Sequence, residues 1–344
     1  MKNLIAYTVV SSPEHNLAGH PENPRRFQHF SRLADSPLSE KLLRIEPQVA
    51  PMPVVTAIHP QSYVSALEQA ASQGPGFLDH GDTYVTTASY QAALEAAGGA
   101  IEVVQAVIEG QARSGFALIR PPGHHTSATR PSGFCLLNNI AIAARYVQSL
   151  GYKRVMIFDF DVHHGNGTQD LFEKDPSILY ISTHQYGIYP GTGSIHETGS
   201  GEGSGSVVNI PLPARAGDQA FNAITDQLIE PIAKRFQPDI LLISAGFDAH
   251  WNDPLASLQL STTGYNQLGT SLFLMAEELC EGKIVYFLEG GYDPDDLWDN
   301  VLAILYSLAK ESLPVDRLGS APFPEESIDH IVETLQILHG IKPL

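Results

Sequence analysis

The segment from residue 154 to residue 164, RVMIFDFDVHH, constrains the fold more than any other part of the chain. It begins as an apolar β-strand and ends in two carboxylates and two imidazoles, which are costly to bury unless they are paired or coordinated. Asp161 and His163 are two positions apart, so in an extended chain both side chains project to the side that Asp159 also shares. The segment predicts a buried strand that ends at a zinc site with oxygen and nitrogen ligands. An ion pair or a capping cluster is the alternative interpretation.

Short apolar runs alternate with longer helical segments along the chain, which is typical of an α/β fold with a parallel sheet buried on both faces. The expected strands are residues 116–119, 155–160, 178–182, 207–210, 240–244 and 284–288. The expected helices are residues 88–109, 138–149, 218–235, 264–281 and 326–338. Because no internal repeat and no long linker divides the sequence, we expect a single domain over residues 1–344.

Polar, glycine-bearing sequences follow five of the expected strands. They are RPPGHH, DVHHGNG, THQYGIYPGTG, AGFDAHWNDP and EGGYDPDD. Loops at the carboxyl ends of parallel strands converge, so these five exits predict one site. Asp248 follows the strand at 240–244 and is the best-placed third ligand for a catalytic zinc with an open position. A single aspartate after a strand also suits a helix cap or a turn.

Three further residues could transfer protons or stabilise developing charge at such a metal site. In the pair His124–His125, one imidazole could accept a proton from the attacking water while the other donates to the leaving group. Asp159 could orient one of these rings and Asn166 the other. Tyr292 follows the last strand and could donate to a developing oxyanion. Paired loop histidines and single tyrosines are, however, often ordinary surface or core residues.

Two aromatic residues, Phe134 and Tyr189, lie in loops expected near this site. If they face each other, they form a narrow slot for the methylene stem of an amine or a lysine side chain. Core packing is the alternative for each. We interpret His164, His184 and His196 as loop or supporting residues and assign Glu289 no catalytic role.

Charge and cysteine content narrow the classes of function. The chain has 20 Lys and Arg residues against 38 Asp and Glu residues, a net charge of −18 that opposes binding to nucleic acid or anionic membranes and favours a cationic substrate. Its two cysteines, Cys135 and Cys280, predict neither a disulfide framework nor a thiolate zinc site, which fits a reducing cytoplasm. No apolar run predicts a signal peptide or a membrane span. The oligomeric state stays open.

Six motifs together resemble the histone deacetylase superfamily, which includes bacterial deacetylase-like amidohydrolases and acetylpolyamine amidohydrolases. They are RPPGHH at 120–125, SGFCLLNN at 132–139, DFDVHHGNGTQ at 159–169, HQYGIYPGTG at 184–193, SAGFDAHWNDPL at 244–255 and LEGGYD at 288–293. The resemblance implies the arginase/deacetylase fold, with three layers around a central, mainly parallel sheet of eight strands.

The resemblance also implies roles for individual residues. Asp161, His163 and Asp248 correspond to the ligands of one zinc ion, His124 and His125 to the proton-handling pair, and Tyr292 to the donor that polarises the carbonyl. Gly133 corresponds to the residue whose backbone carbonyl meets the substrate amide, with Phe134 and Tyr189 as tunnel walls. A potassium ion is implied near Asp159, Asp161, His163, Ser182 and Thr183. Arg26 matches an arginine that lines the acetate-release cavity in some members.

Details within the motifs point to a subfamily. Asn166, where class I enzymes carry aspartate, and the LEGGY sequence resemble the class II branch, and the retained Tyr292 implies full activity. Leu255 stands where polyamine-selective relatives carry glutamate. We therefore expect a zinc-dependent deacetylase that acts on acetyl-lysine side chains or small acetylated amines. The alternatives are an acetylpolyamine-selective enzyme, a two-manganese ureohydrolase and an inactive acetyl-amine binding protein. The ureohydrolase is disfavoured because glycine replaces the last aspartate of its metal motif.

Overall fold

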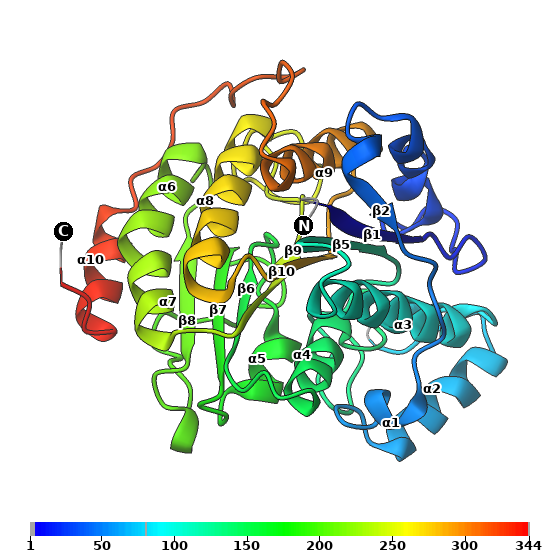
Figure 1. Ribbon diagram of the computed structural model, residues 1–344. Helices are drawn as coiled ribbons and strands as arrows, with labels where there is room; N and C mark the ends of the chain where they lie inside the picture. The colour runs from blue at the N-terminus through cyan, green and yellow to red at the C-terminus, as the bar shows by residue number, and fades with distance from the viewer. Residues whose placement is uncertain (1–3, 80, 343–344) are drawn as a thin grey trace.

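The computed structural model describes residues 4–79 and 81–342 and is built around one eight-stranded sheet (Figure 1). In spatial order its strands are β2 (Leu42–Arg44), β1 (Ile5–Val10), β5 (Ser114–Ile119), β10 (Ile284–Leu288), β9 (Ile240–Ala245), β6 (Val155–Asp159), β7 (Ile178–Gln185) and β8 (Val207–Leu212). Every neighbouring pair is parallel. The expected sheet of eight mainly parallel strands is therefore confirmed.

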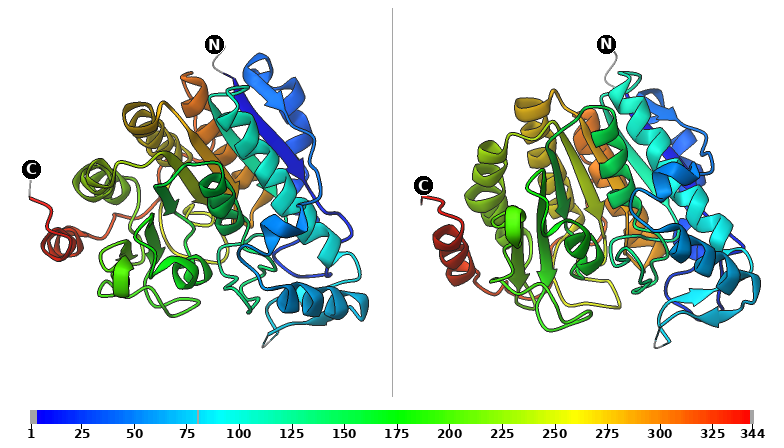
Figure 2. Two further views of the ribbon diagram at one scale, coloured as in Figure 1. Left: turned by 60° about the horizontal axis from the view of Figure 1, so that its bottom comes forward. Right: turned by 90° about the horizontal axis from the view of Figure 1, so that it is seen from below.

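Helices cover both faces of the sheet, which gives three layers (Figures 1 and 2). One layer contains α1 (Met52–Val55), α2 (Gln61–Ser72), α3 (Ser89–Ile108), α4 (Asn139–Ser149) and α5 (Asn166–Phe172). The other contains α6 (Asp218–Ile224), a π-helical turn (Thr225–Ile229), α7 (Glu230–Phe236), α8 (Thr262–Cys280), α9 (Pro294–Ala309) and α10 (Asp329–Leu338). A small antiparallel hairpin, β3 (Gly76–Phe77) and β4 (Tyr84–Val85), lies apart from the sheet.

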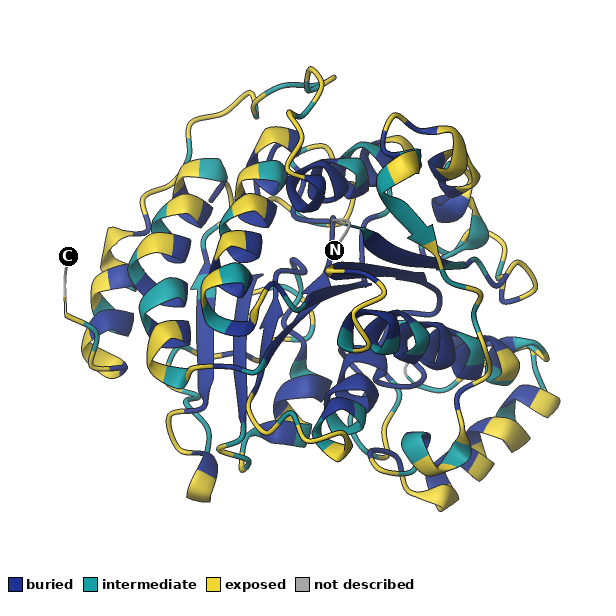
Figure 3. Ribbon diagram, in the orientation of Figure 1, coloured by how far each residue is buried: buried dark blue, intermediate teal, exposed yellow. Residues whose placement is uncertain are grey.

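The strands are buried on both faces, as Figure 3 shows for the centre of the sheet. Side chains alternate between two hydrophobic cores, because successive residues of a strand point to opposite faces. In β5, for example, Phe116 and Leu118 join one core while Ala117 and Ile119 join the other. The near-continuous apolar runs in the sequence thus reflect burial by both helical layers.

Local sequence signals explain where several helices begin and how closely they pack. The Asn138 side chain accepts a hydrogen bond from the backbone of α4, and Ser261 does the same for α8. Asp293 caps α9, and Pro294 occupies its first turn. In the alanine-rich helix α3, a Cβ atom at Gly98 would lie 1.9 Å from the carbonyl oxygen of Gln48, so only glycine allows this close approach.

The structure also corrects the sequence-based elements. All six expected strands exist, but β1, the short edge strand β2 and the hairpin strands β3 and β4 were missed. The expected helix at 218–235 is divided by the π-helical turn, and helices α1, α2, α5 and α9 were not identified. The expected closing helix corresponds to α10, which buries Val332 and Leu335 against the main core. Within the described ranges, no helix combines the length and the apolar character needed to cross a bilayer.

Candidate metal centre and active site

Asp161, His163 and Asp248 lie together at the carboxyl edge of the sheet, beyond the ends of β6 and β9. The Nδ1 atom of His163 is 3.1 Å from Oδ1 of Asp161 and 3.2 Å from Oδ2 of Asp248. Two donors on one zinc ion, each bonded at about 2.0–2.2 Å in tetrahedral geometry, are separated by roughly this distance. The structure therefore brings together the three predicted ligands, although they come from two separate strand exits.

The electrostatics of these three residues also fit a bound metal cation. Burial opposes a charged imidazole, but the adjacent carboxylates of Asp161 and Asp248 raise the pKa of His163 to about 10. Asp248 is fully buried, and apart from the 3.2 Å contact with Nδ1 of His163 its Oδ2 atom accepts no hydrogen bond from the described residues. A buried carboxylate oxygen that accepts no hydrogen bond is costly, and a coordinated metal ion removes that cost. The donor set of two carboxylates and one imidazole fits zinc.

Backbone groups fix the two carboxylates in place. Oδ1 of Asp248 accepts a hydrogen bond of 3.0 Å from the backbone of Val162, and Oδ2 of Asp161 accepts one of 2.8 Å from the backbone of Gly290. A Cβ atom at Gly290 would lie 2.1 Å from Oδ2 of Asp248. A Cβ atom at Gly290 would also lie 2.7 Å from Oδ2 of Asp161, so glycine is required at this position for the backbone to approach both carboxylates.

The tandem histidines lie next to this cluster and have different partners. Nδ1 of His124 lies 3.0 Å from Oδ2 of Asp159, and Nδ1 of His125 lies 2.8 Å from Oδ1 of Asn166. The two ring centroids are 4.0 Å apart. The predicted pairing of Asp159 with one ring and Asn166 with the other corresponds to this geometry, and Asn166 is the first residue of α5 rather than part of a loop.

These partners give the two rings opposite protonation states. Burial disfavours the charged form of His124, but Asp159 and Asp161 outweigh it and raise its pKa to about 10. Burial, together with the nearby His124 and His163, lowers the pKa of His125 well below its usual value. At neutral pH, His124 is therefore a cation and His125 a neutral imidazole that can accept a proton.

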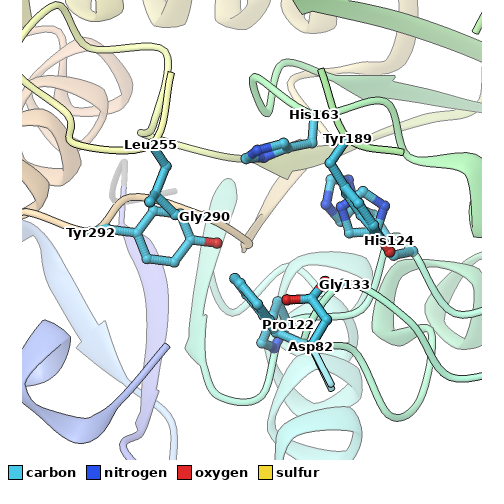
Figure 4. Close-up of a pocket in the computed structure, with 11 residues that line it drawn as sticks. Asp82, Pro122, His124, Gly133, His163, Tyr189, Leu255, Gly290 and Tyr292 are labelled. Carbon is cyan, nitrogen blue, oxygen red and sulfur yellow. The ribbon is translucent and has the colours of Figure 1, made fainter. Parts of the chain in front are cut away.

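Tyr292 faces the metal cluster from the loop after β10, and Figure 4 shows its hydroxyl pointing into the cavity. Burial and the charge of Asp248 raise the pKa of Tyr292 well above its usual value, so the phenol stays a hydrogen-bond donor. Its backbone N–H donates to Oδ2 of Asp253 at 2.8 Å. The guanidinium of the buried Arg26 lies over the ring, 5.0 Å from the centroid, and donates to the carbonyl of Gly291.

A cavity of about 350 Å³ leads to these groups. Phe134 and Tyr189 both line it, as the sequence predicts. Gly133 lines it too, and Figure 4 labels Gly133 and Tyr189 on its wall. The remaining lining residues are Asp82, Pro122, His124, His125, His163, Leu255, Gly290 and Tyr292. A Cβ atom at Gly133 would lie 2.2 Å from Cδ2 of His125, so this glycine permits the wall to touch the His125 ring. The cavity is mostly apolar along its sides and polar at its end.

Sequence reasoning missed Asp82, which lies on the cavity wall. Its loop is held by Asp79, whose side chain accepts hydrogen bonds from the backbone of Gly81, Asp82 and Thr83. The Thr83 hydroxyl in turn accepts a hydrogen bond of 3.1 Å from the backbone of Phe134. The acidic, glycine-bearing sequence at 79–83 predicts a turn of this kind. Its position beside the tunnel wall depends on the contact with Phe134.

Glu289 has a supporting role, consistent with the absence of a catalytic assignment. Its carboxylate accepts hydrogen bonds from the backbone of Gly123 and His124 and from the hydroxyl of Ser244. It thereby joins the exits of β5, β9 and β10. His124, Glu289 and Cys135 also form a compact group, but burial raises the pKa of Cys135 well above its usual value, so the thiolate that a metal prefers is disfavoured.

The residues expected around a potassium ion are neighbours in space. Asp159 pairs with Ser182 in the β6–β7 register, and the Thr183 hydroxyl donates to the carbonyl of Asp159 at 3.5 Å. Asp161 and His163 follow directly. Backbone and hydroxyl oxygens are ligands that suit a monovalent cation, and the potassium site stays a prediction.

Comparisons with known proteins agree with this arrangement. Residues 20–308 match the family model described as "Histone deacetylase domain". The chain belongs to the histone deacetylase family. Its fold and its class of reaction, hydrolysis by a deacetylase, follow from that membership. The match covers every predicted catalytic and metal-binding residue, from His124 to Tyr292.

Individual relatives support the same assignment. "Histone deacetylase 10, chloroplastic" of Oryza sativa subsp. japonica is 44% identical over 315 residues, which cover 86% of this chain and 71% of the relative. "Probable deacetylase" of Archaeoglobus fulgidus (strain ATCC 49558 / DSM 4304 / JCM 9628 / NBRC 100126 / VC-16) is 42% identical over 276 residues, which cover 79% of this chain and 76% of the relative. The solved structure described as "Crystal Structure of HDA15 HD domain" has a TM-score of 0.88 at 32% identity and covers 99% of this deacetylase and 94% of that chain.

Proposed function

We propose that this protein is a zinc-dependent amidohydrolase that removes acetyl groups from acetylated primary amines, including the acetyl-lysine side chain. The observation that carries the proposal is the group of Asp161, His163 and Asp248 at the end of an apolar cavity, opposite the Tyr292 hydroxyl and the neutral His125. Family membership supplies the reaction class, and the donor set favours zinc.

Asp161, His163 and Asp248 would hold the zinc ion, which supplies Lewis acidity that polarises the amide carbonyl and acidifies water. The Tyr292 hydroxyl donates a hydrogen bond to the carbonyl oxygen as negative charge develops there. Its raised pKa keeps the hydroxyl hydrogen in place. Each contribution is greater in the transition state than in the substrate, because the oxygen carries more charge there.

His125 acts as the general base in this proposal. Its Nδ1–H donates to Asn166, which leaves Nε2 free to accept a proton from the attacking water. The protonated ring then returns this proton to the leaving amine nitrogen. His124, paired with Asp159, stays charged and stabilises the developing negative charge nearby.

Phe134, Tyr189 and Leu255 suit the methylene stem of the amine, because they line an apolar passage of limited volume. Asp82 on the same wall could pair with a cationic group further along the substrate. This residue is the one observation that favours the acetylpolyamine alternative, since a polyamine carries such a cation. We propose the broader class of acetylated primary amines because Leu255 supplies no second carboxylate at the mouth.

A two-manganese ureohydrolase fits less well. The position of its additional aspartate is occupied by Gly165, where a Cβ atom would lie 2.1 Å from Oδ2 of Asp159 and 2.6 Å from the Tyr180 hydroxyl. A larger side chain there would displace the partner of His124. The site therefore lacks this additional ligand and has no space for its side chain.

Substrate profiling of purified, zinc-loaded protein tests the proposal. We expect measurable kcat/KM for acetyl-lysine peptides, acetylputrescine and acetylspermidine, with differences that rank the classes. Failure to cleave any acetylated amine while one zinc ion binds normally would contradict the proposal. Two bound manganese ions together with guanidine hydrolysis would instead support the ureohydrolase.

A further inference from the structure

A second cavity of about 760 Å³ lies beside the active-site cavity and shares Leu255 and Tyr292 with it. We call it the side chamber. Its wall is mainly apolar and includes Pro13, Leu17, Pro21, Pro24, Pro254 and Pro294. Proline restricts the backbone, so much of this wall is rigid before any ligand arrives. A preformed apolar cavity next to the site is suited to part of a substrate.

The partition between the two cavities is fixed by Asp253. One carboxylate oxygen accepts a hydrogen bond of 2.9 Å from the backbone of Leu255, and the other accepts the bond of 2.8 Å from the backbone of Tyr292. Asp253 itself is 8% exposed. Leu255, by contrast, is 40% exposed, so the partition ends at the molecular surface. A substrate whose acetyl group lies beside Tyr292 can therefore pass over Leu255 into the side chamber.

The side chamber also carries a cation. Arg25 lines it and is exposed, and none of the carboxylates in the described part of the chain lies within 4.0 Å of its guanidinium. The residues that line the chamber include no aspartate or glutamate, although the chain as a whole carries a net charge of −18. Arg25 would attract an anionic group that enters next to the apolar wall.

We infer that the side chamber binds the far end of the acetylated amine and selects an apolar group that carries a carboxylate. This inference rests on the proposed function, because the acetyl group must occupy the first cavity. The corresponding substrate class is an acetyl-lysine followed by a bulky apolar residue with a free C-terminal carboxylate. The apolar group would contact the prolines and Leu17, and the carboxylate would pair with Arg25.

Four peptides with a blocked N-terminus and an acetylated lysine side chain test the two parts of the inference separately. They are Nε-acetyl-lysyl-phenylalanine and Nε-acetyl-lysyl-glycine, each as the free acid and as the C-terminal amide. We expect kcat/KM for phenylalanine to exceed that for glycine about tenfold, as partial burial of an aromatic ring provides. We expect kcat/KM for the free acid to exceed that for the amide about threefold at low salt. At high salt the two values should be nearly equal, because an exposed ion pair is weak and is screened by salt.

Variants assign these preferences to the side chamber. Ala18 is exposed and lines the chamber, so Ala18→Trp should fill it and reduce the phenylalanine-to-glycine ratio to about one. Arg25→Gln should remove the preference for the acid while the preference for phenylalanine remains. Ala66→Trp places the same side chain at an exposed position of α2 and should retain both preferences.

The outcomes separate this inference from the proposed function. Cleavage of all four peptides at equal rates by the natural protein would overturn the inference alone. An undiminished phenylalanine preference in Ala18→Trp would also overturn it. If zinc-loaded protein cleaves none of the four peptides, the inference fails, and the proposed function fails with it only when the other acetylated amines are not cleaved either.

Discussion

Replacement of Asp248 by asparagine tests the metal centre without relying on activity. Asparagine keeps the shape of the side chain and can still accept the hydrogen bond from Val162, but it removes one anionic ligand. Burial and the charge of Asp161 raise the pKa of Asp248, so its ionised form destabilises the metal-free protein at neutral pH. We therefore expect metal-free Asp248→Asn to unfold at the same temperature as the natural protein or slightly above it.

Zinc should distinguish the two proteins. A ligand present at a thousandfold excess over its dissociation constant stabilises the folded state by about 4 kcal/mol. For 344 residues, the entropy of unfolding is about 0.7 kcal/mol per kelvin, so the natural protein should gain about 6 °C in Tm. If loss of the carboxylate weakens zinc binding about a hundredfold, the gain falls to about 2 °C.

The assay is thermal denaturation after chelator treatment, with and without added zinc. Asp253→Asn is the matched control, since Asp253 is also a buried carboxylate but bonds to the backbone of Leu255 and Tyr292. Its metal-free Tm should fall, because both carboxylate oxygens of Asp253 accept backbone hydrogen bonds and asparagine has only one acceptor oxygen, while its zinc-induced gain should stay near that of the natural protein. An equal zinc-induced gain in Asp248→Asn and the natural protein would refute the assignment of Asp248 as a ligand.

Three other substitutions test different parts of the structure. Tyr292→Phe should lower kcat about a hundredfold to a thousandfold with little change in KM in steady-state assays. The control Tyr186→Phe, at a residue 73% exposed, should change neither kcat nor KM. Equal effects of the two substitutions would contradict the donor role of Tyr292. Gly133→Ala should lower kcat/KM at least tenfold, because the new Cβ would displace His125, and a crystal structure with an unmoved ring would count against this explanation. Glu22→Gln should cost about 3–5 kcal/mol in chemical denaturation at pH 7, because it leaves two buried arginines unpaired. Burial opposes ionisation of Glu22, but the arginines lower its pKa from 4.5 to about 2, so the stability difference should shrink as the pH falls through that range, and a pH-independent difference would exclude this cause.

Local sequence was sufficient for much of the metal site. Asp161 and His163 could be predicted because a two-residue spacing after an apolar strand places both side chains on one side. Asp248 could be proposed because it follows another apolar strand at the same edge of the sheet. The roles of the histidine pair were left open, because the pKa of each ring depends on partners 35 and 41 residues away.

Other features depend on contacts that no local pattern reveals. Asp82 reaches the cavity because Thr83 bonds to Phe134, 51 residues further along the chain. The partition between the two cavities depends on Asp253 and Tyr292, which are 39 residues apart. Strand β1 was missed because its short apolar run at the N-terminus resembles neither a signal peptide nor an alternating strand. The potassium site and the reducing cytoplasm stay predictions.

The position of β10 has a consequence for synthesis of the protein on the ribosome. This strand is the last of the sheet to be translated, yet it pairs with β5 on one side and β9 on the other. A nascent chain that has not reached residue 284 therefore has two strand edges in the middle of its future core. We expect such chains to require protection from aggregation until the final strand emerges and closes the gap.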